Sequence, residues 1–421
     1  MTGPDRPASL EDVWRWEAPY VVAALLRRHG DLGDCEDAAQ EAAAAAVAQW
    51  PTDGVPANPR GWLITVAGRR LVDRLRAREA QERREVAAAL QQPGDAHLAA
   101  AADEVPAGSD DDVLRLMFLC CHPCLSPASQ VALTLRAVGG LSVEQVAAAW
   151  LVPAPTMAQR LSRARSSLRR AGARFAMPEP AELPGRVAAV LHACYLMFNE
   201  GYLRTAAETL GDSELAEEAI GLTRRLRGML PGHAEVAGAL ALMLLTHARR
   251  RARTTPDGDL VPLAEQDRTL WDHHLVAEGL AIVEEVLPRG QVGPFQLQAA
   301  IAAVHAEADS AAETDWLQIS VLYRMLHQLD PSPAVTLNRS VAEAMAFGPR
   351  QGLALLAPLL EDTALRSHHR LHAVQAHLLE MAGDTDGAAS SYRRAAALAA
   401  SRPEQRYLNA RLRRLEAGTV G

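Results

Sequence analysis

The chain has 421 residues, of which 49% are hydrophobic and 4% aromatic, and its formal net charge is −8. This length predicts several domains, and the hydrophobic content is high enough to build buried cores, which excludes a globally disordered protein. All 43 basic residues are arginines, which excludes chemistry that needs lysine, such as Schiff-base formation or phosphate binding by a P-loop lysine. Alanine is abundant and β-branched runs are short, a composition that favours helices.

The cysteines and the N-terminal residues predict a cytoplasmic protein. Five cysteines without regular spacing do not match the framework of a disulfide-rich secreted domain. The first residues show no signal-peptide pattern, and the longest apolar run reaches about half of a membrane span. The run Cys-Cys-His-Pro-Cys at 120–124 lacks the two separated ligand pairs of a zinc site. We therefore expect no membrane segment, no metal and no cofactor.

The charge is unevenly distributed along the chain. Residues 60–84 hold eight arginines and three acids, and residues 155–174 hold six arginines and no acid. Between them, residues 85–112 hold seven acids and no arginine. Two basic segments on an acidic chain are typical of a protein that contacts one polyanion at two places.

Hydrophobic periodicity and turn residues predict an all-α fold with three folded parts. Helices are expected at 10–30, at 34–50, and from Pro59 or Arg60 to Leu90, with a loop at Trp50–Pro59. The predicted divisions are a first helical domain at 8–90, an acidic flexible linker at 91–112, a second helical domain at 113–174, a Pro-rich linker at 175–185 and a helical domain at 186–421.

A spacing of 34 residues recurs in the last of these domains. It joins Ala308, Ala342, Ala376 and Ala410, and it also joins Ser320, Ala354 and Ala388. Helical hairpins with this period are typical of tetratricopeptide repeats. The clearest unit has Ala388, Tyr392 and Ala395 at the small-aromatic-small spacing of those repeats. We predict helical hairpins that resemble tetratricopeptide repeats.

Residues 141–170 carry the pattern of a helix-turn-helix. Ser142 and Gln145 form a capping box, and Pro155 suits the first turn of the second helix. On that helix an inward stripe consists of Met157, Leu161, Ala164 and Leu168. The outward face carries Thr156, Gln159, Arg160 and Arg163. Such a face reads base edges in the DNA major groove, or it is the solvated basic side of an ordinary helix pair; this segment alone leaves both open.

A second pattern lies upstream, where an acidic helix precedes a basic helix that bears a tryptophan. The acidic helix contains Asp37-Ala38-Ala39-Gln40-Glu41. After the turn-rich loop, the basic helix follows in the segment Asn58–Glu79. Its apolar positions alternate in helical register with arginines.

In this order and spacing, residues 10–172 resemble bacterial RNA polymerase sigma factors of the extracytoplasmic-function (ECF) class. The resemblance implies that Asp37, Gln40 and Glu41 dock on core RNA polymerase. It implies contacts with the minus-10 promoter element from Asn58, Trp62, Arg69, Arg70, Arg74 and Arg76. It assigns minus-35 recognition to Thr156, Gln159, Arg160 and Arg163. The chain departs from the family at Leu151 and Pro155, where glycine is usual or frequent.

The long helical tail resembles a subgroup of the family with a C-terminal extension. The strings FLCCHPCLSP at 118–127 and YLMFNEGY at 195–202 carry this resemblance. It implies that the tail replaces a separate anti-sigma regulator, either through contact with the sigma domains or by binding an unknown protein or ligand in a groove of the repeats.

The predicted function is therefore promoter-specific transcription initiation with core RNA polymerase and promoter DNA as partners. Residue spacings for a catalytic site are not found, so an enzyme is not expected. One alternative is a one-component helix-turn-helix transcription factor, which leaves the Asp37–Glu41 helix unexplained. A repeat scaffold is the other, and it leaves both arginine-rich segments unexplained.

Overall fold

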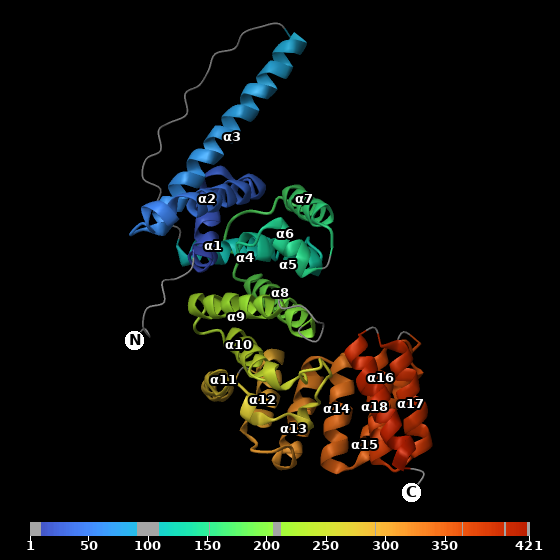
Figure 1. Ribbon diagram of the computed structural model, residues 1–421. Coiled ribbons are helices and arrows are strands. Elements are labelled where there is room, and N and C mark those ends of the chain that lie inside the picture. Colours follow the sequence, from blue (N-terminus) through green and yellow to red (C-terminus); the bar gives the residue numbers. More distant parts are fainter. Residues whose placement is uncertain are drawn as a thin grey trace. The chain divides into compact units, whose positions relative to one another are not determined.

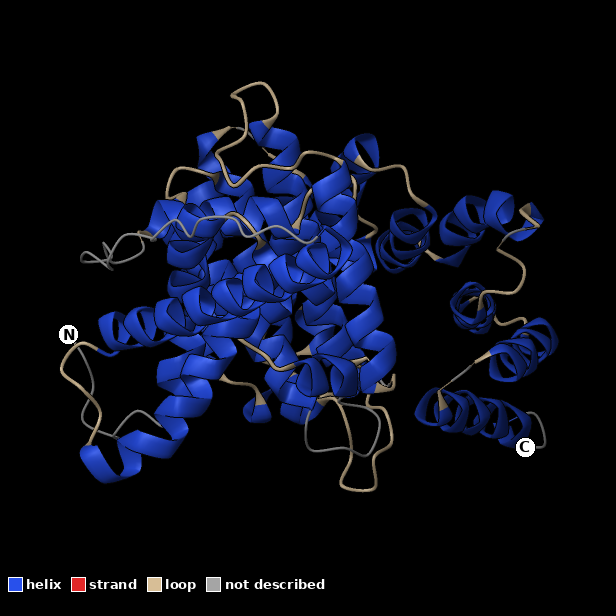
Figure 2. Cartoon of the chain, turned by 90° about the horizontal axis from the view of Figure 1, so that it is seen from above, coloured by secondary structure: helices blue, strands red, loops and turns tan. Residues whose placement is uncertain are grey.

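The computed structural model describes residues 10–90, 109–150, 152–204, 212–290, 292–363, 365–399 and 401–418. Within these ranges the regular structure is helical, apart from one isolated antiparallel bridge between Thr254 and Leu260 (Figure 2). The all-α prediction is confirmed. The chain divides into two compact units, Met1–Leu196 and Met197–Gly421, which are described separately below.

The N-terminal unit is built around its first helix (Figure 1). Its helices are α1 (Leu10–His29), α2 (Leu32–Asp53), α3 (Pro59–Leu90), α4 (Asp110–Cys120), α5 (Pro127–Ala137), α6 (Val143–Ala149) and α7 (Ala154–Arg170), with α8 (Leu183–Arg204) at the unit boundary. Residues 18–26 of α1 are all buried, because α1 packs against α2 and α3 on one side and against α4 and α5 on the other. Both predicted sigma domains therefore share one central helix.

Local capping explains where several of these helices begin. The Asp31 carboxylate accepts the backbone N–H of Asp34 at 3.0 Å and caps α2. Ser109 and Asp112 form a reciprocal capping box at the start of α4. The box predicted for Ser142 and Gln145 is present at α6, with N···O distances of 2.8 and 3.2 Å.

Three expected boundaries differ from the structure. Helix α2 continues through Pro51 to Asp53, so the loop predicted at Trp50–Pro59 is confined to residues 54–58; the chain leaves the helix at Gly54, whose φ is +81°. Helix α4 begins at Asp110, inside the predicted linker, because Ser109 provides its cap. The rest of that linker, 91–108, lies outside the described residues. Helix α8 begins at Leu183, within the expected Pro-rich linker, and the unit boundary falls inside it.

The C-terminal unit is a series of antiparallel helices (Figure 1). They are α9 (Asp212–Met229), α10 (Ala234–His247), α11 (His273–Val286), α12 (Pro294–Glu307), α13 (Trp316–Leu329), α14 (Pro333–Phe347), α15 (Pro349–Glu361), α16 (His369–Met381), α17 (Thr385–Leu398) and α18 (Arg402–Gly418). Ala342 and Ala376 occupy buried positions of α14 and α16, and the predicted trio Ala388, Tyr392 and Ala395 is buried in α17. Ala354 is exposed, so not every position of the 34-residue pattern is a buried position of the fold. The assignment to tetratricopeptide repeats stays a prediction.

One stretch of this unit differs from the expected helices joined by short turns. Residues 248–272 form an extended segment with short 3-10 turns, because its prolines and glycine interrupt any helical period. Arg268 in this segment donates to the carbonyl oxygens of His305 and Ala308 at 2.6 and 2.7 Å. From α18, Arg406 reaches back to Asp259 at 2.5 Å. The segment is thereby attached to α12 and α18, two helices that both follow it in the sequence.

Gly140 is a position where the fold tolerates only glycine. Its φ is +72°, and an added Cβ would lie 2.8 Å from the Cβ of Ala18 and 3.0 Å from Nε1 of Trp14. We expect Gly140→Ala to cost about 1–2 kcal/mol through its left-handed backbone, and about 1–3 kcal/mol more through overpacking. Urea unfolding of the full chain, followed by tryptophan fluorescence, measures the loss.

Gly172→Ala is the matched control, because Gly172 also has positive φ, +62°, but no atom within 4 Å of the added Cβ. It carries only the backbone cost. Equal destabilisation by the two variants would show that the contact of Gly140 with α1 is unimportant.

Candidate functional site

The predicted reading helix is present as α7, preceded by the short helix α6 (green in Figure 1). Met157, Leu161, Ala164 and Leu168 are buried, as the periodicity predicts. Thr156, Gln159 and Arg163 are exposed on the opposite face. The guanidinium of Arg160 lies over the indole ring of Trp150, 5.0 Å from its centroid, which holds α6 and α7 together. Three of the four predicted minus-35 residues thus face solvent, and Arg160 is half-buried.

The residues predicted to contact the minus-10 element lie on α3 and at its start. Asn58 caps α3, since its side-chain oxygen accepts the N–H of Gly61 at 2.9 Å. Trp62 is half-buried and packs edge-on against Trp50, with 5.3 Å between ring centroids. The other predicted residues of this group that are exposed are Arg69, Arg70 and Arg76.

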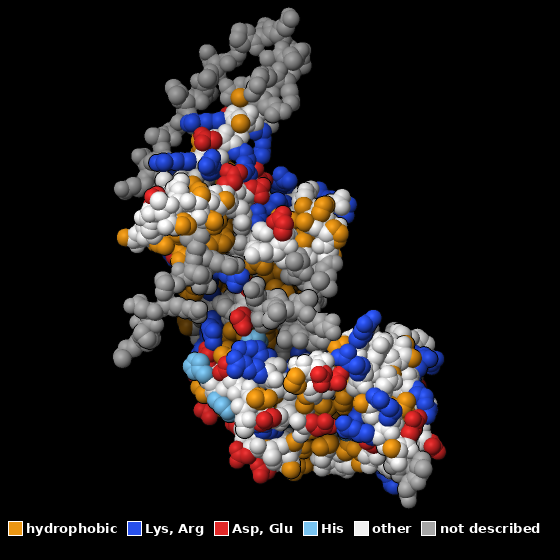
Figure 3. All heavy atoms as spheres, viewed as in Figure 1, with side chains coloured by type: hydrophobic (Ala, Val, Ile, Leu, Met, Phe, Trp, Pro, Cys, Tyr) orange, Lys and Arg blue, Asp and Glu red, His pale blue; other side chains and the backbone are white. Residues whose placement is uncertain are grey.

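Arg74 differs from these arginines because it is paired with the acidic helix. It binds Asp37, with 3.5 Å between Nη1 and Oδ2, and it also binds Glu41. Arg78 donates to both carboxylate oxygens of Asp34, at 2.9 and 2.7 Å. Figure 3 shows arginine and acidic side chains next to one another over α2 and α3. The acidic and basic patterns found in the sequence are therefore partly neutralised by each other.

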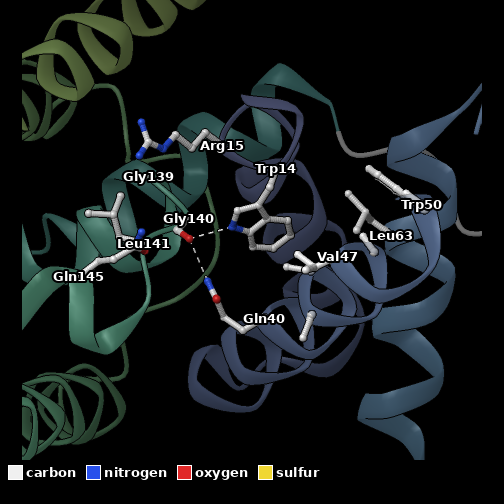
Figure 4. Close-up of a pocket in the computed structure, with 13 residues that line it drawn as sticks. Trp14, Arg15, Gln40, Val47, Trp50, Leu63, Gly139, Gly140, Leu141 and Gln145 are labelled. Carbon is white, nitrogen blue, oxygen red and sulfur yellow. Dashed lines mark hydrogen bonds between the residues drawn. The ribbon is translucent and has the colours of Figure 1, made fainter. Parts of the chain in front are cut away.

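The turn that precedes α6 contacts the first domain through one backbone carbonyl. The oxygen of Gly140 accepts hydrogen bonds from Nε1 of Trp14 at 2.8 Å and from Nε2 of Gln40 at 3.0 Å (Figure 4). Gln40 was predicted to face the polymerase. In this arrangement it is bound to the helix-turn-helix domain of the same chain.

A buried carboxylate lies beside this contact. Glu36 is 1% exposed and pairs with Arg165 of α7, while Arg136 of α5 is paired with Asp37 at 3.5 Å. Burial raises the pKa of Glu36 above its ordinary value, although Arg165 and Arg136 oppose this. A buried ion pair of this kind is a weak source of net stability, but an unpaired buried carboxylate is expensive. The pair therefore fixes which surfaces meet more than it adds to stability.

Asp37, Gln40 and Glu41 are thus all engaged within the chain, with partners on α3, on α5 and at the turn before α6. Sequence reasoning did not find Glu36, Arg136 or Arg165 as contact residues. Arg165 lies within the arginine-rich segment, one helical turn from Leu161 and Leu168, and that position at the edge of the buried stripe was the available signal.

Within the cysteine-rich run at 120–124, Cys120 and Cys121 pack as apolar residues, whereas Cys124 is exposed. Cys120 and Cys121 are buried, and burial raises the pKa of Cys121 to about 11 and raises that of Cys120 as well. Thiols that stay protonated are poor metal ligands. Among the described residues, no three His, Cys, Asp or Glu side chains lie close enough to hold a metal ion.

Comparison with protein families adds independent evidence on these domains. Residues 15–81 match the model of Sigma-70 region 2, and residues 115–168 match that of Sigma-70 region 4. Residues 186–287 match a family of unknown function, DUF6596. The chain belongs to the ECF class of RNA polymerase sigma factors. As a sigma factor it is a transcription initiation factor and not an enzyme.

Relatives of this sigma factor include one that shares nearly its whole length. The uncharacterized protein R00370 of Rhizobium meliloti (strain 1021) is 39% identical over 400 residues, which is 95% of this chain and 94% of the relative. The probable ECF RNA polymerase sigma factor SigI of Mycobacterium tuberculosis, from strains CDC 1551/Oshkosh and H37Rv, is 31% identical over 197 residues, which is 47% of this chain and 65% of the relative. No solved structure matches the chain.

Within the described part of the sigma factor, every helix is too short or too polar to cross a membrane.

Because Glu36 and Arg165 form a buried pair between the two sigma domains, loss of Arg165 should promote separation of these domains. We expect Arg165→Ala to leave Glu36 buried without its main partner, at a cost of about 3–5 kcal/mol, which separation of the domains would relieve. Hydrogen exchange of the full chain should become faster at residues 32–46 and 135–142.

Arg169→Ala is the control, because Arg169 and its partner Asp31 are 69% and 36% exposed in their side chains. Exposed pairs contribute about 0–1 kcal/mol, so exchange should stay close to that of the wild type. Unchanged exchange in Arg165→Ala would contradict a role of this ion pair in holding the domains together.

Proposed function

We propose that this sigma factor initiates transcription by opening its N-terminal unit, docking α2 on core RNA polymerase and placing α3 and α7 on promoter DNA. The observation that carries the proposal is the exposed polar face at the N-terminal half of α7, on a helix whose opposite face is buried. In a helix-turn-helix, this part of the second helix enters the major groove.

Recognition of the minus-35 element rests on Thr156, Gln159 and Arg163. Gln can bind adenine and Arg can bind guanine with two hydrogen bonds each, and Thr can contact a thymine methyl group. Arg160 is held over Trp150 and supports the helix pair. Its role toward DNA is a phosphate contact at the edge of the interface, which positions the helix without reading sequence.

Contacts with the minus-10 element come from α3. Arg69, Arg70 and Arg76 are exposed and suited to bind phosphates. The indole of Trp62 is a surface on which an extruded base can stack, as aromatic side chains do in other proteins that bind single strands. Arg74 keeps α2 and α3 together through Asp37 and Glu41 and is released for DNA only if that network changes.

Docking on core polymerase uses Asp37, Gln40 and Glu41. In the arrangement described above, Gln40 is bound to Gly140 and Asp37 to Arg136. Polymerase therefore competes with the helix-turn-helix domain for the same face of α2. The raised pKa of Glu36 supports this displacement, because it reflects the cost of burying the carboxylate. An ion pair that carries such a cost is easier to replace with another partner than an ion pair that strongly stabilises the fold.

The C-terminal unit regulates this opening, either by contact with the sigma domains or through a ligand or protein bound to its helices. In its favour, this unit contains a cavity of about 350 Å³ lined by Leu337 and Asn338 of α14, Leu359 of α15, and Arg370 and Leu371 of α16. Its mostly apolar lining, which includes Arg370, suits an apolar partner with an acidic group.

The reading face is tested by the combined change Thr156→Ala, Gln159→Ala and Arg163→Ala. Each lost base contact costs about 1–3 kcal/mol of discrimination, so promoter-specific run-off transcripts should fall about tenfold or more. The assay uses the full chain, core polymerase and a promoter library.

The matched control is Arg350→Ala with Gln351→Ala, an exposed arginine and glutamine on α15. It should transcribe like the wild type. If the α7 variant keeps full promoter-specific transcription, α7 is not the reading helix. If the wild type binds promoter duplex without polymerase and never co-elutes with polymerase, the protein acts as a one-component transcription factor.

The regulatory role of the tail is tested by comparing the full chain with residues 1–204, which end with α8. We expect the two proteins to give different amounts of run-off transcript per bound polymerase, and the ratio gives the sign of the control. Equal amounts from both proteins would contradict regulation by the tail.

A further inference from the structure

A cavity of about 430 Å³ lies where the two sigma domains meet (Figure 4). One side is formed by residues of α1, α2 and α3, among them Trp14, Val47, Trp50 and Leu63. The opposite side is formed by the turn Gly139–Leu141 and by Gln145 of α6. In Figure 4 the indole of Trp14 extends between the turn and α2. The cavity therefore exists only while the domains are together.

The size and lining of this cavity match a site for a small molecule. Such sites measure roughly 300–1,000 Å³ and are mostly apolar, with few polar groups that orient the ligand. Here the walls are two indoles, aliphatic side chains and the alanines Ala43, Ala44 and Ala46. The polar side chains of the lining are Arg15, Gln40 and Gln145. Ala44 and Val47 are exposed although they are apolar, so a ligand would cover surface that now faces water.

One polar group of the lining is left without a partner. Trp50 is 5% exposed, and its indole Nε1 has no hydrogen-bond acceptor. Its ring meets the ring of Trp62 edge-on at 5.3 Å, which does not replace an acceptor. By contrast, the indole N–H of Trp14 is satisfied by Gly140. A buried donor without an acceptor is uncommon in folded proteins. An acceptor on a ligand would satisfy it if the indole turned its buried nitrogen toward the cavity.

We propose that this cavity binds a small, flat, apolar molecule that carries a hydrogen-bond acceptor, and that the bound molecule holds the two sigma domains together. The molecule lies between Trp14, Trp50 and the turn at Gly140, and its acceptor binds the N–H of Trp50 once the indole turns this nitrogen, which is buried in the structure, toward the cavity. Because both domains provide walls, it binds the closed arrangement and not the open one.

The consequence for function rests on the proposed function, in which polymerase needs the face of α2 that Gly140 now covers. A ligand specific for the closed form stabilises it by the factor 1 + [L]/Kd. At ten times its Kd, the molecule should therefore weaken the apparent affinity for core polymerase about tenfold.

Binding is tested with 8-anilinonaphthalene-1-sulfonate, an aromatic probe whose sulfonate accepts hydrogen bonds. The full chain is labelled with 15N at its seven tryptophans, and each indole N–H resonance is assigned with a Trp→Phe variant. We expect the resonances of Trp14 and Trp50 to shift until saturation. The resonances of Trp271 and Trp316, in the C-terminal unit, should not move.

Two variants of α2 locate the probe. Ala44→Phe places a ring in the cavity wall and should abolish the shifts at Trp14 and Trp50. Ala48→Phe adds the same ring at an exposed position of the same helix outside the lining, and should leave the shifts intact. Thermal unfolding followed by circular dichroism verifies that both variants fold. Absent shifts in the wild type, or shifts that persist in Ala44→Phe, would overturn the proposal.

The functional experiment measures how much of each protein co-elutes with core polymerase. For each protein, the amount with the probe is divided by the amount without it. The ratio should fall about tenfold for the wild type and Ala48→Phe at ten times the Kd, and stay near one for Ala44→Phe. If the Trp50 resonance shifts to saturation but this ratio stays unchanged, the molecule binds without holding the two sigma domains together, which would overturn that part of the proposal. Failure of the wild type to bind polymerase before any probe is added is the separate failure of the proposed function.

Discussion

Glu36 is a fully buried carboxylate on the helix that carries the polymerase-docking pattern, and its main partner, Arg165, lies on the reading helix 129 residues later. A buried charge must be paired, so burying Glu36 requires α7 to lie against α2. The neighbouring contacts follow from this placement: Arg136 reaches Asp37, and the carbonyl of Gly140 comes within hydrogen-bond distance of Trp14 and Gln40. One ionisable side chain thereby couples the two surfaces that we propose to bind polymerase and promoter DNA.

This coupling is reciprocal in the thermodynamic sense. Anything that binds α2 in place of the helix-turn-helix domain releases α7, and anything that binds α7 and displaces α2 exposes the face of α2 that we propose to dock on polymerase, by the same free energy in both directions. Under the proposed function, core polymerase and promoter DNA therefore assist each other's binding. Burial raises the pKa of Glu36, so the Glu36–Arg165 ion pair adds little net stability. Such a pair suits a contact between α2 and α7 that has to be given up for another partner.

The sequence predicted local structure well and long-range pairing poorly. The capping box of Ser142 and Gln145 and the buried stripe from Met157 to Leu168 depend on residues close in sequence, so periodicity and capping rules find them. Asp37 and Arg74 are predicted to contact two different partners, and the sequence pattern does not reveal that they also bind each other. A charge in the sequence has several possible partners, and here the direct packing of α2 against α3 decides among them.

In the C-terminal unit, the attachment of Asp259 to Arg406 spans 147 residues. At about 5–20 residues per second of synthesis, the ribosome makes this partner about 7–30 s after Asp259. During that interval the segment 248–272 lacks its attachment to α18. The segment is therefore fully attached only after α18 has been synthesised, and a chain released before that point would present the segment without this contact.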